Sequence, residues 1–204
     1  MPFWQLCQTL LSLLAARSSQ LLNVSDLSRN TAIAQSTLKR YVTLLEAVFL
    51  VRRVPAWMPN ISKRVVKSPK VMLCDSGLAA YLSGQDQAFL IKQPQAWDHI
   101  LESFVGMELL KQTGWSRKIS RLYHYRTHGG REVDLVLEDR AGRVVGVEVK
   151  SSASLKSDAA AGIKDLAEAT GDRFIRGIIL YMGDSIVPLA GNIHAVPLQE
   201  LWSW

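Results

Sequence analysis

The chain has 204 residues, of which 48% are apolar and 21% charged, so it can bury one sizeable core or two small ones and is not a disordered chain. Its two cysteines form neither a disulfide framework nor a zinc-ligand spacing, and no apolar run approaches the ~20 residues of a membrane span. We therefore expect a cytoplasmic protein without a membrane partner. The net charge is +6, and the excess lies in residues 1–75, which hold ten Lys and Arg against three Asp and Glu. This asymmetry suggests a polyanionic partner, most simply nucleic acid, although an acidic protein surface would also fit.

The first twenty residues carry apolar side chains at helical spacing. These are Phe3, Leu6, Leu10, Leu13 and Leu14. No basic residue precedes them, and polar residues interrupt the run, so we expect an amphipathic helix rather than a signal peptide.

A helix-turn-helix pattern follows. Ser25 can cap a short helix that carries Leu27, and a turn around residues 32–34 leads to a second helix from about Gln35. The inner side of that second helix carries Leu38, Tyr41, Val42 and Leu45. The strands VFLVRRV, which ends at Pro55, and KVMLCD come next, with a basic loop between them. This order is that of a winged helix-turn-helix, which we place at residues 1–92.

The polar face of the second helix and the basic loop carry residue types that bind phosphates and base edges. The candidates for nucleic-acid binding are Gln35, Ser36, Lys39, Arg40, Lys63, Arg64 and Lys67. Winged helices also serve as dimerisation or protein-docking modules, and a polar helix face can simply be solvated. DNA binding and protein docking therefore both remain open.

Residues 93–204 predict a second domain. Its expected elements are a helix at 96–114, strands at about 119–126, 131–138 and 143–150, a helix at about 157–169, the strand FIRGIILYM and the segment NIHAVPL. The order αβββαβ indicates an α/β domain and, with the first domain, a mixed α/β (α+β) fold for the chain.

The segment EDRAGR predicts the turn of a β-hairpin. A three-residue loop suits a type I turn followed by a left-handed residue, and Gly142 falls where that residue must lie. The register that follows pairs Val133 with Val149, Leu135 with Val147 and Leu137 with Val145. One face of the hairpin is then entirely apolar, and a slip by one residue would destroy the match.

The same register places Asp134 opposite Glu148 on the other face, with their β-carbons about 5 Å apart. Lys150 stands two residues beyond Glu148, opposite Glu132. Two carboxylates so close repel each other, and burial raises the cost. Mg²⁺ or Mn²⁺, which prefer oxygen ligands, would relieve both problems, and a lysine beside them can activate water. The other interpretation is an exposed face with ordinary charge pairs from Lys150 to Asp134 and Glu132.

With VDLVLEDRAGRVVGVEVKSS in view, the second domain resembles the PD-(D/E)XK nuclease superfamily, which includes restriction endonucleases and Holliday-junction resolvases. The family pattern is an Asp on the second strand and E-x-K on the third. It matches Asp134, Glu148 and Lys150, although Val133 stands where the family usually has Pro. The resemblance implies a restriction-endonuclease-like fold and a Mg²⁺-dependent DNA phosphodiesterase. Its metal would bind Asp134, Glu148 and the carbonyl of Val149, and Lys150 would assist the attacking water.

Members of this superfamily often add a Glu from the preceding helix, where it supports the metal. Glu102 matches that position best. By helical phase, however, Glu108 lies in the middle of the apolar arc of the helix, and it is the competing candidate. Either could instead be a structural carboxylate.

Nearly the whole chain, from the helix-turn-helix through ESFVGMELLK to GVEVKSS, is also similar to the C-terminal region, called a domain of unknown function, of a large family of bacterial and archaeal AAA+ ATPases. This similarity implies an ATPase core as a partner. The chain contains no G-x-x-x-x-G-K-[ST] motif, so we expect no ATP site in it, and it is either a C-terminal fragment or a stand-alone form. Because nuclease-like folds can lose their chemistry, a non-catalytic DNA- or protein-binding regulatory module of an ATPase is the alternative function.

Overall fold

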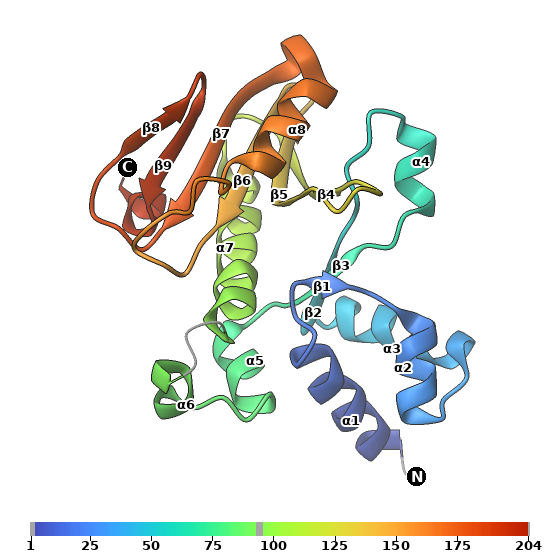
Figure 1. The fold of residues 1–204 in the computed structure, drawn as a ribbon. Helices are drawn as coiled ribbons and strands as arrows, with labels where there is room; N and C mark the ends of the chain where they lie inside the picture. The colour runs from blue at the N-terminus through green and yellow to red at the C-terminus, as the bar shows by residue number, and fades with distance from the viewer. Residues whose placement is uncertain (1–2, 93–95, 204) are drawn as a thin grey trace. The chain divides into compact units, whose positions relative to one another are not determined.

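The computed structural model describes residues 3–92 and 96–203 (Figure 1). Helices and strands are mixed along the chain, as expected for an α+β fold. They form two compact units, one of Met1–Val54 with Ser68–Met107 and the other of Pro55–Lys67 with Glu108–Trp204. Each unit has its own sheet. Among the described residues, no helix has both the length and the apolarity needed to cross a bilayer.

The first unit combines helices with a small antiparallel sheet of strand order β1-β3-β2. Its elements are α1 (Phe3–Ala15), β1 (Gln20–Leu21), α2 (Val24–Thr31), α3 (Gln35–Ala47), β2 (Val51–Val54), β3 (Lys70–Leu73), α5 (Ser76–Leu82), α6 (Gln87–Lys92) and the first part of α7 (Ala96–Trp115). The cap of α2 differs from the prediction. Asn23 accepts the N–H of Asp26 at 3.0 Å, and Ser25 donates its hydroxyl to the same Asn23 oxygen at 2.7 Å. Asn23 is the N-cap because it directly precedes the first helical residue.

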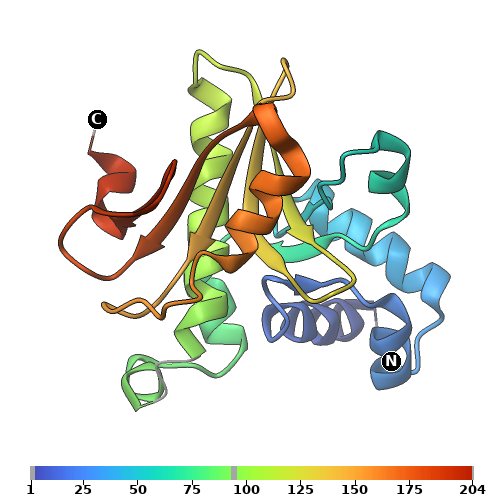
Figure 2. The ribbon, with the colours of Figure 1, turned by 45° about the horizontal axis from the view of Figure 1, so that its top comes forward.

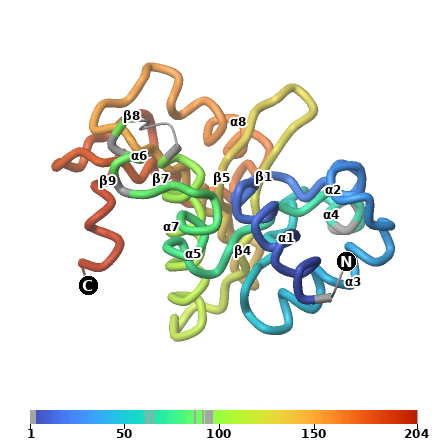
Figure 3. The backbone as a smooth tube through the Cα atoms, turned by 90° about the horizontal axis from the view of Figure 1, so that it is seen from below, coloured from blue at the N-terminus to red at the C-terminus, as the bar shows by residue number. Residues whose placement is uncertain are grey.

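The core of the first unit is formed by its three N-terminal helices, which run from dark to light blue in Figure 3, together with β2, β3 and α5. Leu38, Val42 and Leu45 of α3 are buried there, as the helical spacing predicts. They pack in one cluster with Leu10 and Leu14 of α1. The opposite, polar side of α3 is consequently left at the surface.

The second unit is built on a six-stranded mixed sheet of order β4-β5-β6-β7-β9-β8. Its elements are α4 (Ile61–Val66), the second part of α7, β4 (Ser120–Arg126), β5 (Glu132–Asp139), β6 (Val144–Val149), α8 (Ala161–Thr170), β7 (Phe174–Tyr181), β8 (Val187–Ala190), β9 (Ile193–Pro197) and the 3₁₀ helices η1 (Gly171–Arg173) and η2 (Leu198–Trp202). The predicted order of helix, three strands, helix and strand is present. The exposed edge strand β8, which contains Pro188, was not expected.

Helix α8 lies on one face of this sheet and the second half of α7 on the other (Figure 2). Glycines allow α8 to approach closely. A Cβ on Gly162 would lie 1.8 Å from the carbonyl oxygen of Glu132, and one on Gly177 would lie 2.3 Å from Ile163. The face of the hairpin that was predicted to carry the carboxylates is therefore covered by a helix, as expected.

Residues 55–67 connect two strands of the first unit but belong to the second. The N–H of Trp57 donates to the carbonyl of His124 at 2.6 Å, and the N–H of His124 donates to the carbonyl of Pro55 at 3.0 Å. Trp57 is fully buried. The division thus differs from the boundary predicted between residues 92 and 93. The expected wing loop packs with the second unit, which also takes the end of α7 from Glu108 onward.

Candidate functional site

Strands β5 and β6 form the predicted hairpin in the predicted register. The pairs are Leu135–Val147, Val136–Gly146, Leu137–Val145 and Glu138–Val144. The predicted pairs Val133–Val149 and Asp134–Glu148 are not among the pairs of the described strands. In the turn, the N–H of Gly142 donates to the carbonyl of Asp139 at 3.0 Å, and Gly142 has the left-handed φ of 76°. Arg143 donates hydrogen bonds to the Asp139 carboxylate, which holds the pKa of that carboxyl below its usual value. The local turn chemistry therefore sets the register.

The pairing of β5 with β4 contains a β-bulge at Asp134. The flanking pairs are Tyr123–Val136 and Tyr125–Val133. His124 alone consequently faces both Asp134 and Leu135, and the extra residue breaks the alternation of side chains along β5. Val133 packs with Val136 in the cluster under α8. The prediction that Val133 belongs to the apolar face of Leu135 is therefore wrong, because the alternation does not continue through the bulge.

Asp134 lies at the bulge and bonds to the neighbouring strand β6 on the other side of β5. Its Oδ2 accepts the backbone N–H of Val149 at 2.9 Å, where a regular β5 would offer a backbone carbonyl. Asp134 and Glu148 are both buried, and each is 8% exposed. The bulge thus brings the carboxylate of Asp134 to the strand segment that carries Glu148.

Lys150 lies at the end of β6 beside Glu148. Its Nζ donates to Oε1 of Glu148 at 2.8 Å, and its backbone N–H donates to the carbonyl of Leu180 at 2.8 Å, which anchors the strand end. The side chain of Lys150 is 37% exposed. Within residues 3–92 and 96–203, no group of three or more His, Cys, Asp and Glu side chains is arranged to hold a metal ion. A metal at this site would therefore rest on two carboxylates.

The two helix glutamates have different partners. Glu102 lies in the first unit, where its Oε1 accepts a hydrogen bond from the amine of Lys70 at 2.6 Å. Glu108 lies in the second unit, forms an ion pair with Lys111 and accepts the indole N–H of Trp202 at 3.3 Å. A role for either glutamate beside a metal stays a prediction.

Comparison with known families decides the membership of the chain. The family described as Domain of unknown function (DUF4143) matches residues 97–201, which make up half of the chain. The chain belongs to the DUF4143 family. A second family, described as Domain of unknown function (DUF8612), matches residues 5–88. DUF4143 domains are commonly found with AAA-type ATPases.

Relatives of this DUF4143 chain include longer proteins. The uncharacterized protein Rv2008c of Mycobacterium tuberculosis and the uncharacterized protein Mb2031c of Mycobacterium bovis are each 31% identical to it over 192 residues. The match covers 93% of this chain and 41% of each relative, so the chain spans less than half of their length. No solved structure matches the chain.

In this DUF4143 chain, the predicted nucleic-acid-binding residues divide between the two units. Gln35, Ser36, Lys39 and Arg40 are exposed on α3 in the first unit, whereas Lys63, Arg64 and Lys67 lie on the 55–67 segment in the second. The side chain of Lys63 lies outside the described part of the structure. The amine of Lys67 is 3.1 Å from Nε2 of His128.

Arg64 packs and forms an ion pair within the second unit. Its guanidinium donates to Glu138 at 2.8 Å and lies 5.3 Å from the ring centre of Trp57 and 5.1 Å from that of Tyr123. The hydrogen bond between them lowers the pKa of Glu138 and raises the pKa of Arg64. Only 11% of the Arg64 side chain is exposed, and its binding to phosphates stays a prediction. Its partner Glu138 is 74 residues away in the sequence.

Proposed function

We propose that the second unit is a Mg²⁺- or Mn²⁺-dependent DNA phosphodiesterase of the PD-(D/E)XK type. The observation that carries this proposal is the burial of two carboxylates, Asp134 and Glu148, on neighbouring strands beside the amine of Lys150. Burying like charges costs free energy, even where a lysine amine and a backbone N–H are partners as they are here. Residues kept at such a cost are typical of sites that carry out chemistry.

The donor atoms at this site fit a hard divalent cation. Mg²⁺ prefers oxygen ligands, usually keeps several waters, and binds through only one or two carboxylates. Val149 adds a third oxygen donor. In an extended strand the C=O of a residue points to the same side as its N–H, and the N–H of Val149 points at Asp134. When bound, the cation would supply Lewis acidity and a water of lowered pKa.

The residues of the site have separate tasks in this proposal. Asp134 and Glu148 hold the cation, and the backbone N–H of Val149 fixes the orientation of Asp134. Lys150 is the most exposed of the charged groups, so its amine can orient the attacking water and stabilise the charge that develops on a phosphate.

Asp134→Asn tests the metal site without disturbing the ladder, because the amide oxygen can still accept the N–H of Val149. We expect Mg²⁺ or Mn²⁺ to raise the melting temperature of the wild type by mass action on the folded state, and not that of the variant. Isothermal titration calorimetry should detect binding to the wild type alone. Asp158→Asn is the matched control, because Asp158 is exposed and its side chain makes no hydrogen bond or ion pair among the described residues. Equal metal responses in Asp134→Asn and Asp158→Asn would remove the metal site.

Cleavage is a separate measurement on duplex, single-stranded and branched DNA. We expect Lys150→Met to lose cleavage and to keep the metal-dependent rise in melting temperature, whereas Lys156→Met, at an exposed position of the same unit, should lose neither. Metal binding without cleavage of any substrate would support the alternative, a non-catalytic regulatory module. The observation on its side is that Val149 and Lys150 already bond to an oxygen of each carboxylate.

We also propose that the first unit is a winged helix-turn-helix that binds DNA and that an ATPase core is a partner of the protein in the cytoplasm. The polar surface of α3, which carries the exposed cations Lys39 and Arg40, supports the DNA proposal. The family's common occurrence with AAA-type ATPases supports the ATPase partner.

Duplex affinity measured against salt concentration tests the DNA proposal. Neutralised phosphates release counterions, so affinity should fall steeply with salt. Changing Lys39 and Arg40 together to Gln should lower the slope of log affinity against log salt by about 2, one for each phosphate contact. Lys92→Gln, an exposed change in the same unit, should leave the slope unchanged. A flat salt dependence would leave protein docking as the role of α3.

A further inference from the structure

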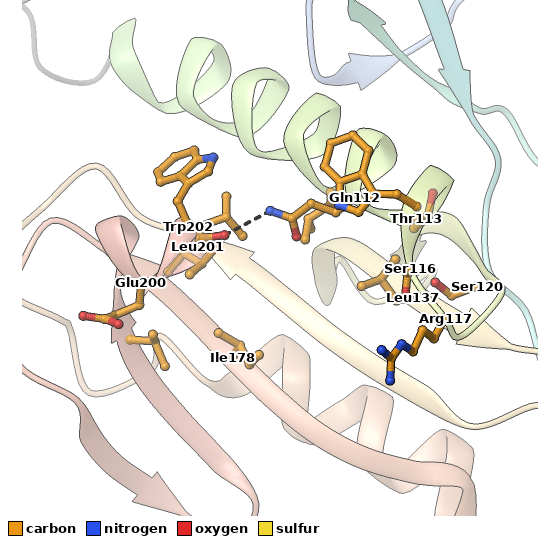
Figure 4. A pocket seen from close by; sticks show the side chains of 14 residues that line it. Gln112, Thr113, Ser116, Arg117, Ser120, Leu137, Ile178, Glu200, Leu201 and Trp202 are labelled. Atoms are coloured by element: carbon orange, nitrogen blue, oxygen red, sulfur yellow. Dashed lines mark hydrogen bonds between the residues drawn. The ribbon is translucent and has the colours of Figure 1, made fainter. Parts of the chain in front are cut away.

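The second unit contains a cavity of about 880 Å³ on the face of its sheet opposite α8 (Figure 4). Four apolar side chains form its floor: Leu137 of β5, Ile178 and Leu180 of β7, and Val196 of β9. The second half of α7 and the 3₁₀ helix η2 form its walls. Pockets that bind small molecules have volumes of about 300–1,000 Å³, so this cavity is large enough for a ligand.

The cavity is distinct from the carboxylate site. Leu180 pairs with Val149 in the β6–β7 register, and the two side chains share one face of the sheet. Glu148 is the neighbour of Val149 and points to the other face, together with Gly146, which meets α8. Because side chains alternate along a strand, the cavity and Glu148 lie on opposite faces, and the proposed function makes no use of the cavity.

Two hydrogen bonds join the walls of the cavity. Gln112 of α7 donates its side-chain N–H to the carbonyl of Leu201 at 3.0 Å, which joins α7 to η2 across the cavity (Figure 4). Trp202 donates its indole N–H to Glu108 at 3.3 Å and so makes a second connection between the same two elements. Two indole rings line the cavity while remaining at the surface, since Trp115 is 72% and Trp202 is 45% exposed. An apolar ligand would cover aromatic surface that is now in contact with water.

The two ends of the cavity carry side chains of opposite charge. Arg117 lines it at one end and Glu200 at the opposite end, as Figure 4 shows. The hydrogen bonds and ion pairs of the described residues include none from the Arg117 guanidinium. The hydroxyls of Ser116 and Ser120 line the same end as Arg117. An anion would therefore meet a cation and two hydroxyls at this end and would be repelled at the other.

We propose that this cavity binds an amphipathic anion, a molecule with an elongated apolar chain and a carboxylate or phosphate head group. The chain lies on the apolar floor between Leu137 and Val196, and the head group accepts hydrogen bonds from Arg117. The occupant is a single dissolved amphiphile such as a free fatty acid, rather than a membrane surface.

Titration calorimetry of the whole chain with dodecanoate, dodecyl phosphate and dodecylammonium tests this proposal at concentrations below micelle formation. We expect saturable binding of one molecule of either anion and at least about tenfold weaker binding of the cation, which lacks the charge-assisted hydrogen bonds. Arg117→Gln should weaken anion binding about tenfold. Lys118→Gln is the matched control, because Lys118 is the adjacent exposed cation and does not line the cavity. Val196→Phe, which places a ring on the floor, should abolish binding in a protein whose melting curve shows that it is folded.

Several outcomes would overturn the proposal. They are no saturable binding to folded wild type, equal affinities for dodecanoate and dodecylammonium, and equal effects of Arg117→Gln and Lys118→Gln. Vesicles of phosphatidylcholine with and without phosphatidylglycerol separate the two sources of such an anion. Sedimentation with the anionic vesicles, without binding of the free amphiphiles, would identify a membrane-surface site and reject the cavity as a site for a dissolved ligand.

Discussion

The closest packing in the second unit predicts opposite effects for the same substitution in two helices. In Gly162→Ala the added Cβ would lie 1.8 Å from the carbonyl oxygen of Glu132, whereas ordinary contact begins at 3.4 Å. Helix α8 would have to move by about 1.6 Å, the difference between these distances. Overpacking of this kind costs about 3 kcal/mol, and the better helix propensity of alanine returns at most about 1 kcal/mol. We therefore expect Gly162→Ala to lower the free energy of unfolding by about 2 kcal/mol.

Gly114→Ala in α7 is the matched control, because nothing lies within 4 Å of its added Cβ. It should raise the free energy of unfolding by up to about 1 kcal/mol through helix propensity alone. Urea denaturation followed by circular dichroism measures both variants. If Gly162→Ala is as stable as Gly114→Ala, then α8 does not pack against β5 as described. Helix α8 would then not cover this face of the hairpin either.

Three further predictions concern individual side chains. The hydrogen bond from Arg64 lowers the pKa of Glu138, so the stabilisation from the ionised Glu138 is complete above the ordinary glutamate pKa and is lost as the pH falls through the lower pKa of the folded state. Urea unfolding across acid pH should show this loss of stability, and Glu138→Gln should make the free energy of unfolding less dependent on pH. Burial and the hydrogen bond to Asp165 raise the pKa of Tyr125, so an ultraviolet titration should show an ionisation step above the ordinary tyrosine pKa, and Tyr125→Phe should remove that step. Phe49 has a φ of 59° and is 80% exposed, so Phe49→Gly should raise the free energy of unfolding by about 0.5–1 kcal/mol in urea denaturation, and a loss of stability would show that the ring contributes more than its exposure suggests.

The hairpin was predictable because its determinants are local. The residues of the turn select Gly142 for the left-handed position, and the alternation of valines and leucines then admits one register. The sequence places Asp134 and Glu148 on this hairpin for the same reason, but the pairs of the described strands end at Leu135–Val147, before the predicted pair of carboxylates. The helix cover over the face that carries Val136 and Gly146 also followed from the sequence.

Features that depend on distant partners were not predictable. The bulge at Asp134 requires His124 of β4 to face two residues, and no pattern within β5 shows this. The basic loop is assigned to the winged helix in the prediction because it lies between the two strands that follow the helix-turn-helix. Trp57 was the available signal to the contrary, since a large apolar side chain in a basic loop needs a core to enter, and it enters the core of the second unit. The guanidinium of Arg64 likewise forms an ion pair with Glu138, which lies 74 residues away in the sequence.

The hydrogen bond that Asp134 makes at the bulge determines which substitution there can change metal binding without changing the free energy of unfolding. Its carboxylate is the acceptor for the N–H of Val149, so Asp134→Ala removes both a charge and a ladder hydrogen bond. Leaving a buried N–H without an acceptor costs about 1–3 kcal/mol, and we expect that loss in metal-free Asp134→Ala. Asp134→Asn keeps the acceptor and should be as stable as the wild type without metal, or more so, because one of two neighbouring negative charges is gone. If urea denaturation instead finds both variants equally destabilised, the charge itself holds the fold together, and the cost of burial no longer points to catalysis.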